Sequence, residues 1–300
     1  MTRLDITITQ RPLPSFAAFT ELLKPVTWFA PMWAFMCGVV SSGVSITDRW
    51  AAFVGGVVLA GPMVCAASQA VNDWFDRHVD AINEPGRPIP SGRVPGRWGL
   101  WIAIAWSVGS LILARALGLW AFGATIIAVA LAWAYSAPPV RLKTSGWWGP
   151  GVVGLSYEGV AWVTGAAVML NAAPPLAVIA LAILYSIGAH GIMTLNDFKA
   201  IEGDRQMGVR SLPATLGPDR AARIACGVMV VPQLIVIIGL IGAGRPFHGM
   251  IIVSLLLIQI VLMRRLLTDP RGLAPWYNAT GTTLYVLGML VSAFAIRGVL

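Results

Sequence analysis

Long apolar blocks alternate with short polar segments along most of this 300-residue chain. Each block is close to the roughly 20 residues that an α-helix needs to cross a bilayer, and the apolar residues are contiguous, without the alternation typical of β-barrel strands. The pattern predicts nine membrane-spanning helices, near residues 26–46, 51–71, 98–114, 119–136, 151–170, 174–195, 221–242, 247–263 and 279–296. We therefore expect an all-α, polytopic membrane protein with a single membrane-embedded domain over residues 1–300.

Composition excludes a water-soluble domain. Hydrophobic residues make up 57% of the chain and charged residues only 11%, whereas soluble chains carry about 25% charged residues. The three cysteines, Cys37, Cys65 and Cys226, lie in apolar blocks, without a CxxC pair or a nearby histidine cluster. We interpret them as small core residues, neither zinc ligands nor disulfides.

The basic residues predict the orientation in the membrane. Of the 21 lysines and arginines, 17 fall on one side of the predicted spans, including Arg3, Arg11 and Lys24 in the N-terminal segment. Because cytoplasmic loops are rich in Lys and Arg, we expect the N-terminus and the longer loops to be cytoplasmic and the C-terminus to be outside. This bias, with attraction to anionic lipid, accounts for the net charge of +8, so nucleic-acid binding is not expected.

The acidic residues are concentrated in two places. Seven of the thirteen lie in two short runs that begin where an apolar block reaches the cytoplasmic side. The first run contains Asp73, Asp76, Asp80 and Glu84, and the second contains Asp197, Glu202 and Asp204. An Asn-Asp pair opens both, at residues 72 and 196. The repeat predicts two related helical halves, about 26–150 and 151–297, that each present an acidic helix end to a shared centre.

The spacing within the runs indicates their chemistry. From Asn72 to Asp80 the polar residues recur at intervals of three, four and seven, which places them on one face of a helix, and Asp197 and Asp204 are also seven apart. Such carboxylates repel one another unless cations lie among them, and oxygen ligands suit Mg²⁺, which commonly bridges carboxylates to phosphates. Neighbouring arginines and lysines are suited to bind phosphate oxygens. These residues favour a membrane enzyme that acts on a lipid-tailed diphosphate; the alternative is a pair of solvated loops in which acids and bases pair.

Longer strings resemble a known family. The strings are NDWFDRHVDAINEPGRPIPSG from Asn72 to Gly92, YSAPP from Tyr135 to Pro139, and NDFKAIEGDRQMGVRSLPATLG from Asn196 to Gly217. They are similar to the UbiA superfamily of intramembrane prenyltransferases, and within it to the chlorophyll and bacteriochlorophyll synthase branch. The resemblance implies a helical bundle around a central cavity. One departure is Ala200, where many superfamily members carry an aspartate four residues before Asp204; the synthase branch shares this variant.

The resemblance implies an esterification: transfer of a geranylgeranyl or phytyl group from its diphosphate to the propionate carboxylate of bacteriochlorophyllide a. It implies Mg²⁺ as the cofactor, with Asn72, Asp73, Asp76, Asp197 and Asp204 as ligands and Asp80 as a further catalytic residue. The candidate substrate-binding residues are Arg77, Arg141, Lys143, Lys199, Arg205 and Tyr135. Because the acceptor carboxylate is already ionised at neutral pH, no general base is required.

A few residues outside the acidic runs are candidates for lesser roles. Aromatic side chains could shield an allylic cation through their π faces; these are Trp74, Phe75, Tyr135, Tyr157 and Trp162. His190 is interpreted as a packed helix residue, with axial ligation of the pigment's magnesium as the alternative. Glu158 falls inside a predicted span, where a carboxyl is expensive unless it is paired.

Three other functions remain open at this point. The acceptor could be chlorophyllide a, or a quinone precursor or haem in another UbiA-type prenyltransferase. A cation-coupled transporter is disfavoured, because its carboxylates would lie near the bilayer midplane. The resemblance implies a bacterial inner membrane, specifically the photosynthetic intracytoplasmic membrane, and partners that include a tail reductase and pigment-binding membrane proteins.

Overall fold

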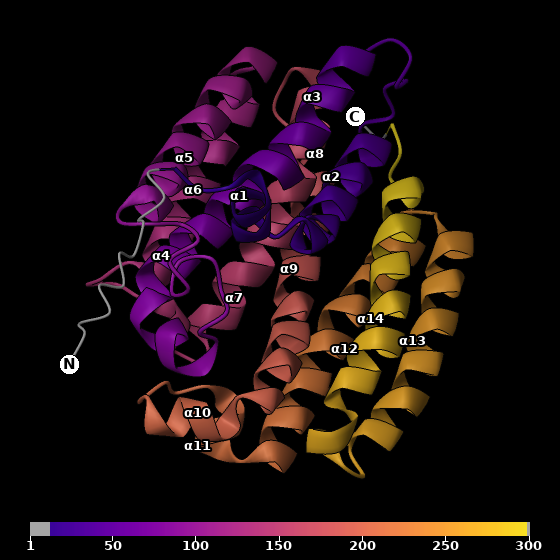
Figure 1. Ribbon diagram of the computed structural model, residues 1–300. Helices are drawn as coiled ribbons and strands as arrows, with labels where there is room; N and C mark the ends of the chain where they lie inside the picture. The colour runs from indigo at the N-terminus through magenta and orange to yellow at the C-terminus, as the bar shows by residue number, and fades with distance from the viewer. Residues whose placement is uncertain (1–12, 299–300) are drawn as a thin grey trace, which may run out of the picture.

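The computed structural model describes residues 13–298, which form a bundle of helices (Figure 1). Within those residues the only β-type pairing is an isolated bridge between Ser145 and Arg210. The predicted all-α fold is confirmed. Arg3 and Arg11, two of the basic residues that predict the orientation, lie outside the described residues.

The helices follow one another with short connections. The first group is α1 (Phe16–Leu23), η1 (Pro25–Trp28), α2 (Phe29–Ser42), α3 (Trp50–Val58), η2 (Leu59–Cys65), α4 (Ala66–Asn83), α5 (Trp98–Leu117), α6 (Leu119–Ser136) and η3 (Leu142–Thr144). The second is α7 (Trp148–Gly154), η4 (Leu155–Val160), α8 (Ala161–Leu170), α9 (Leu176–Asn196), η5 (Asp197–Lys199), α10 (Ile201–Gln206), α11 (Leu212–Leu216), α12 (Pro218–Gly242), α13 (Pro246–Leu266) and α14 (Pro270–Ala295). Two connecting segments, η2 and η4, are π-helical turns inside longer helices, a feature often found at functional sites.

The prediction of about nine spans is confirmed, with shifted boundaries. Eight helical stretches in the described residues are long and apolar enough to cross a membrane, and α14, with 26 residues, is also long enough. The second span is predicted to end near residue 71, but α4 continues to Asn83 because no glycine or proline interrupts it before Pro85. The last helix begins earlier than predicted, because Pro270 occupies its first turn and Asp269 accepts a hydrogen bond from the Gly272 amide.

Glycines allow the N-terminal helix α2 to lie directly against α8. A Cβ atom on Gly38 would overlap the Trp162 carbonyl oxygen, and one on Gly165 would overlap the Phe35 carbonyl oxygen. Small residues at such crossings permit close backbone approach in membranes. Because α14 packs on both α2 and α9, the first and last spans meet and close the bundle (Figure 1).

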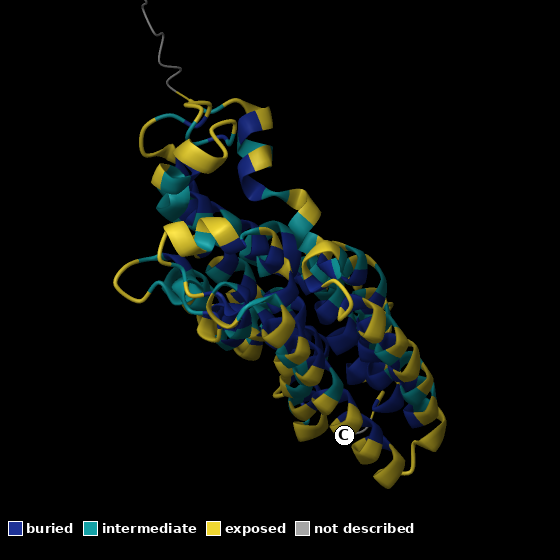
Figure 2. Ribbon diagram, turned by 90° about the horizontal axis from the view of Figure 1, so that it is seen from below, coloured by how far each residue is buried: buried dark blue, intermediate teal, exposed yellow. Residues whose placement is uncertain are grey.

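The outer faces of the bundle are apolar and exposed. Figure 2 shows buried residues in the interior and exposed ones along the outer helix faces and loops. The exposed side chains on α12 and α13 include Ile238, Leu257 and Val261. Large apolar groups on an outer helix face are suited to contact lipid tails.

Candidate active site

The first acidic run begins on the inner side of α4, which is helical from Asn72 to Asp80 as predicted. Asp73 and Asp80 are 1% and 6% exposed, and Asn72 and Asp76 are half-buried. Carboxylates so deeply buried need compensating charge, because burying an unpaired ion costs roughly several kcal/mol.

Two cations outside the predicted site compensate the buried pair. Lys24 Nζ lies 2.6 Å from Asp73 Oδ1. Arg87 Nη1 lies 2.9 Å from Asp80 Oδ2 and 3.5 Å from Asp73 Oδ1, and its Nε lies 2.6 Å from Glu84 Oε2. The junction between α1 and η1 and the loop after α4 therefore each contribute a cation to this helix. The sequence held a signal for each residue: Lys24 stands directly before the first span, and Arg87 follows the acidic run closely.

A second pair of cations lies on the other side of the run, on the segment between α6 and α7. Lys143 Nζ donates to Asn72 Oδ1 at 3.1 Å and lies 2.5 Å from Asp76 Oδ1. Arg141 Nη2 lies 3.4 Å from the same Asp76 oxygen. Burial lowers the pKa of Lys143, against the opposing effect of the Asp76 carboxylate. Both cations are in the predicted set of substrate-binding residues, and the structure brings them to the acidic run.

The second acidic run is not one continuous helix. Helix α9 ends at Asn196, residues 197–199 form a 3₁₀ turn, and α10 begins at Ile201. The helical face expected from the spacing of Asp197 and Asp204 is therefore wrong. The physical reason is that Phe198 and Ile201, which are 1% and 2% exposed, both insert into the core and turn the chain.

The two aspartates of the second run differ in their surroundings. Asp204 Oδ2 accepts a hydrogen bond of 2.5 Å from Ser211 Oγ. Burial raises the pKa of Asp204, and the Ser211 hydrogen bond opposes that effect. The Asp197 carboxylate forms no hydrogen bond or ion pair within residues 13–298. Asp197 is thus free to contact a ligand.

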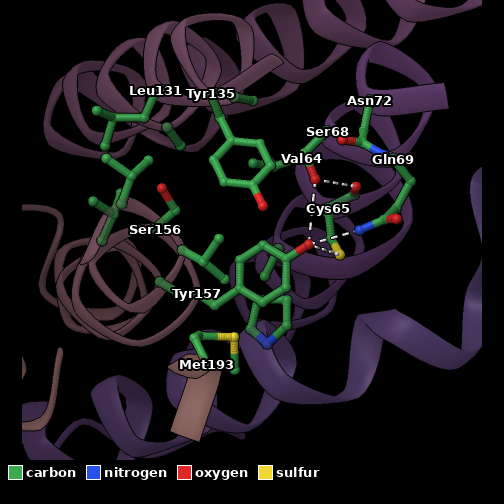
Figure 3. Close-up of a pocket in the computed structure, with 18 of the residues that line it drawn as sticks. Val64, Cys65, Ser68, Gln69, Asn72, Leu131, Tyr135, Ser156, Tyr157 and Met193 are labelled. Atoms are coloured by element: carbon green, nitrogen blue, oxygen red, sulfur yellow. Dashed lines mark hydrogen bonds between the residues drawn. The ribbon is translucent and has the colours of Figure 1, made fainter. Parts of the chain in front are cut away.

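A cavity of about 320 Å³ connects the two runs. At one end it is lined by Asn72, Tyr135, Lys143, Asn196 and Asp197. The wall then follows α4 and η2 away from Asn72 to an apolar end that includes Leu59, Ala60 and Ala161. The Tyr135 hydroxyl points into this cavity (Figure 3) and interacts electrostatically with Asp76, Asp197 and Asp204. Asn72 of the first run and Asp197 of the second therefore line the same end of the cavity.

Other predicted site residues point elsewhere in this structure. Arg77 stacks on the Trp74 ring at 4.1 Å and donates to the Trp74 carbonyl. Arg205 donates to the Ala214 carbonyl, and Lys199 is exposed. Their contacts with a diphosphate stay predictions.

Only some of the candidate aromatic residues line the cavity. Tyr135 and Tyr157 line it, whereas Trp162 stacks on Tyr185 in the core at 5.6 Å between ring centroids. His190 packs against the Trp147 ring at 5.4 Å, which agrees with its interpretation as a packed helix residue. Glu158 is buried, and its Oε2 has no hydrogen-bond partner among the described residues.

The donor atoms of the two runs fit Mg²⁺ in kind. They are carboxylate and amide oxygens, the ligands that this hard cation prefers. Asp73 Oδ2 is buried without a hydrogen-bond partner in residues 13–298, so this oxygen is already desolvated and is available as a metal ligand. Within the same residues, no three His, Cys, Asp or Glu side chains are gathered closely enough to hold an ion. The first-run carboxylates are paired instead with lysines and arginines, which a metal ion would have to displace.

Replacing Arg87 with alanine is expected to destabilise the protein. The change leaves Asp80 without its cation and removes one of the two cations that contact Asp73. We expect the free energy of unfolding to fall by about 1–3 kcal/mol, less than for a fully buried pair, because the Arg87 side chain is 26% exposed. The measurement is the thermal unfolding midpoint of the purified protein in detergent. The matched control is Arg271→Ala, which breaks an ion pair to Glu202 in which both side chains are more than half exposed. Equal shifts in the two variants would contradict the role assigned to Arg87.

A helical bundle of this kind, with acidic and basic groups at one end of an apolar cavity, defines an intramembrane protein suited to an anionic group that carries an apolar chain. The chain belongs to the UbiA prenyltransferase family, whose family pattern matches residues 17–296. The predicted prenyltransferase class is thereby confirmed, and the transporter alternative is set aside.

Individual relatives cover nearly the whole chain. It is 58% identical to the bacteriochlorophyll synthase 33 kDa chain of Cereibacter sphaeroides, over 98% of both chains. It is 36% identical to the chloroplastic chlorophyll synthase of Oryza sativa subsp. japonica, over 92% of this chain and 75% of that protein. A structure of a UbiA homologue from Archaeoglobus fulgidus bound to DMAPP and Mg²⁺ matches with a TM-score of 0.75 and 21% identity, over 94% of this chain and 100% of that chain. That likeness shows the shared fold.

Proposed function

We propose that the protein catalyses the esterifying late step of bacteriochlorophyll synthesis. In this reaction a geranylgeranyl or phytyl group passes from its diphosphate to the propionate carboxylate of bacteriochlorophyllide a. The observation that carries the proposal is the 58% identity, over 98% of both chains, to the bacteriochlorophyll synthase chain of Cereibacter sphaeroides. The lower identity of 36% to the rice chlorophyll synthase favours bacteriochlorophyllide over chlorophyllide as acceptor.

The polar end of the cavity binds the diphosphate in this proposal. Bound Mg²⁺ would neutralise the diphosphate as a leaving group, with Asn72, Asp73, Asp76, Asp197 and Asp204 as the candidate ligands. Arg141 and Lys143 lie beside Asp76 and are placed to bind phosphate oxygens. Asp80 lies further along α4 and forms an ion pair with Arg87. Arg77, Lys199 and Arg205 are proposed as further diphosphate contacts.

In this proposal the rest of the cavity binds the isoprenoid tail and excludes water from the reaction. Apolar residues at the far end, such as Leu59 and Ala161, are suited to the chain. The acceptor carboxylate is ionised at neutral pH, so it can attack without a base. The residues of this chain therefore need to bind, orient and dehydrate the two reactants, and no proton needs to be removed.

We also propose where the enzyme works. The N-terminus and the segments that carry the acidic runs face the cytoplasm, in the photosynthetic intracytoplasmic part of a bacterial inner membrane. Interleaved basic residues on that side support this orientation. A tail reductase and pigment-binding membrane proteins are the proposed partners, and the two related halves remain part of the proposal.

The direct test uses purified protein in detergent with bacteriochlorophyllide a, geranylgeranyl diphosphate and Mg²⁺. We expect the esterified pigment, and we expect a chelator to abolish its formation. In competition, bacteriochlorophyllide a should be consumed ahead of chlorophyllide a. Product from 4-hydroxybenzoate or haem, with none from either chlorophyllide, would overturn the proposal in favour of another acceptor class.

A further inference from the structure

A hydrogen-bonded cluster that the mechanism above does not use crosses the cavity below the first acidic run. Gln69 Nε2 donates to the Tyr157 hydroxyl oxygen at 2.8 Å. Ser68 Oγ and Cys65 Sγ lie 3.4 Å and 3.5 Å from the same oxygen. Figure 3 shows these side chains converging on Tyr157 from α4 and the end of η2. The cluster joins the two halves of the chain at the level of the π-helical turns η2 and η4.

The cluster lies between the polar end of the cavity and its apolar end. Gln69 is three residues from Asn72, or about 5 Å along an α-helix. Beyond Cys65 the same wall continues with Val64 and Leu59, which are apolar. A prenyl diphosphate with its anionic end at Asn72 therefore places its first carbon, C1, beside Gln69 and Tyr157.

The chemistry at C1 makes this position sensitive to water. The bond from C1 to the diphosphate oxygen breaks, and its electron pair leaves on the diphosphate. A carboxylate oxygen of the acceptor then donates an electron pair to C1 to form the ester. A water molecule at the same place would form the prenyl alcohol instead and release a proton. The ratio of alcohol to ester therefore reports the hydration of C1.

We propose that Gln69 and Tyr157 are positioning residues that keep the cavity dry at C1, an inference that rests on the proposed prenyl transfer. Their hydrogen bond pairs one amide N–H of Gln69 with the Tyr157 hydroxyl oxygen, so a water molecule is not needed between these two atoms. An amide N–H that loses its partner inside a protein carries a desolvation cost, and it binds a water molecule where space allows. The cavity provides the space directly beside the cluster.

The test compares two variants by product partition. Tyr157→Phe leaves the Gln69 amide unpaired, and we expect the ratio of geranylgeraniol to ester to rise about tenfold, which corresponds to about 1.4 kcal/mol between the competing barriers. The double variant Tyr157→Phe with Gln69→Met removes both partners, so no polar group is left unpaired and the ratio should return towards that of the wild type. The matched control is Tyr185→Phe, which removes a buried hydroxyl that is hydrogen-bonded to Ser292 outside the cavity. Its ratio should stay unchanged.

Two results would overturn the inference. One is a ratio of geranylgeraniol to ester in Tyr157→Phe that equals the ratio in the wild type. The other is a double variant whose ratio is as high as that of the single variant, which would indicate lost packing instead of an unpaired amide. Release of geranylgeraniol without any acceptor is measured in parallel. If the wild type forms no ester at all, the proposed function fails. The role of the cluster is then decided by the rate of geranylgeraniol release, which should be higher in Tyr157→Phe than in the wild type or the double variant.

Discussion

Replacing Asp76 with alanine is expected to lower kcat for prenyl transfer by roughly a thousandfold, the upper range for loss of one group that stabilises developing charge. Asp76 is the point where the acidic run meets the cations of the α6–α7 segment, since one of its oxygens lies 2.5 Å from Lys143 Nζ and 3.4 Å from Arg141 Nη2. Its loss removes a proposed metal ligand and releases both cations from their place. The measurement is the initial rate at saturating substrates.

The Asp76 side chain is 18% exposed, and its loss leaves Lys143 without its carboxylate partner, so we expect a folded protein with a modestly lower unfolding midpoint. A single cooperative unfolding transition in detergent is the check that the fold survives. Asp48→Ala is the matched control, since Asp48 is an exposed acid on a loop before α3 and pairs with no lysine or arginine among the described residues. Asp204→Ala should lose activity as Asp76→Ala does. Substantial activity in both variants would contradict the proposal that the two acidic runs act together.

The arrangement of spans was predictable from the sequence because the bilayer imposes it. Apolar blocks of sufficient length have few alternatives to a helix in lipid, where every backbone polar group must be satisfied within the segment. The end of the second span was not predictable in this way. Hydropathy falls after residue 71, yet α4 continues to Asn83, because Asn72, Asp73 and Asp80 face the cavity or the protein interior instead of lipid.

The candidate site was predictable in part, for a similar reason. Local spacing correctly placed Asn72 to Asp80 on one helix, because that segment is regular. It failed for Asp197 and Asp204, because the burial of Phe198 and Ile201 decides the path of the chain there. Lys24 reaches Asp73 from 49 residues away, and such a pairing depends on how α1 packs on α4. Spacing along the chain carries no information on contacts of that kind.

Replacing Gly38 with alanine is expected to cause the largest loss of stability. The new Cβ would overlap the carbonyl oxygen of Trp162 and lie 2.7 Å from the Ala166 amide nitrogen. Both atoms belong to the α8 backbone, which cannot turn away as a flexible side chain can. We expect a destabilisation of about 3 kcal/mol or more, the upper range for overpacking, seen as a lower thermal unfolding midpoint in detergent.

The same substitution at Gly227 separates this crossing from the general cost of glycine in a helix. Gly227 lies within α12 with nothing within 4 Å of the position that its Cβ would take. Gly227→Ala should therefore be neutral or stabilising, by up to about 1 kcal/mol, because alanine favours the helix. Prenyl transfer should fall in Gly38→Ala alone, since Pro31 of α2 and Thr164 of α8 both line the cavity and any separation of the two helices displaces its wall. Equal behaviour of the two variants would show that close contact between α2 and α8 contributes nothing to the site.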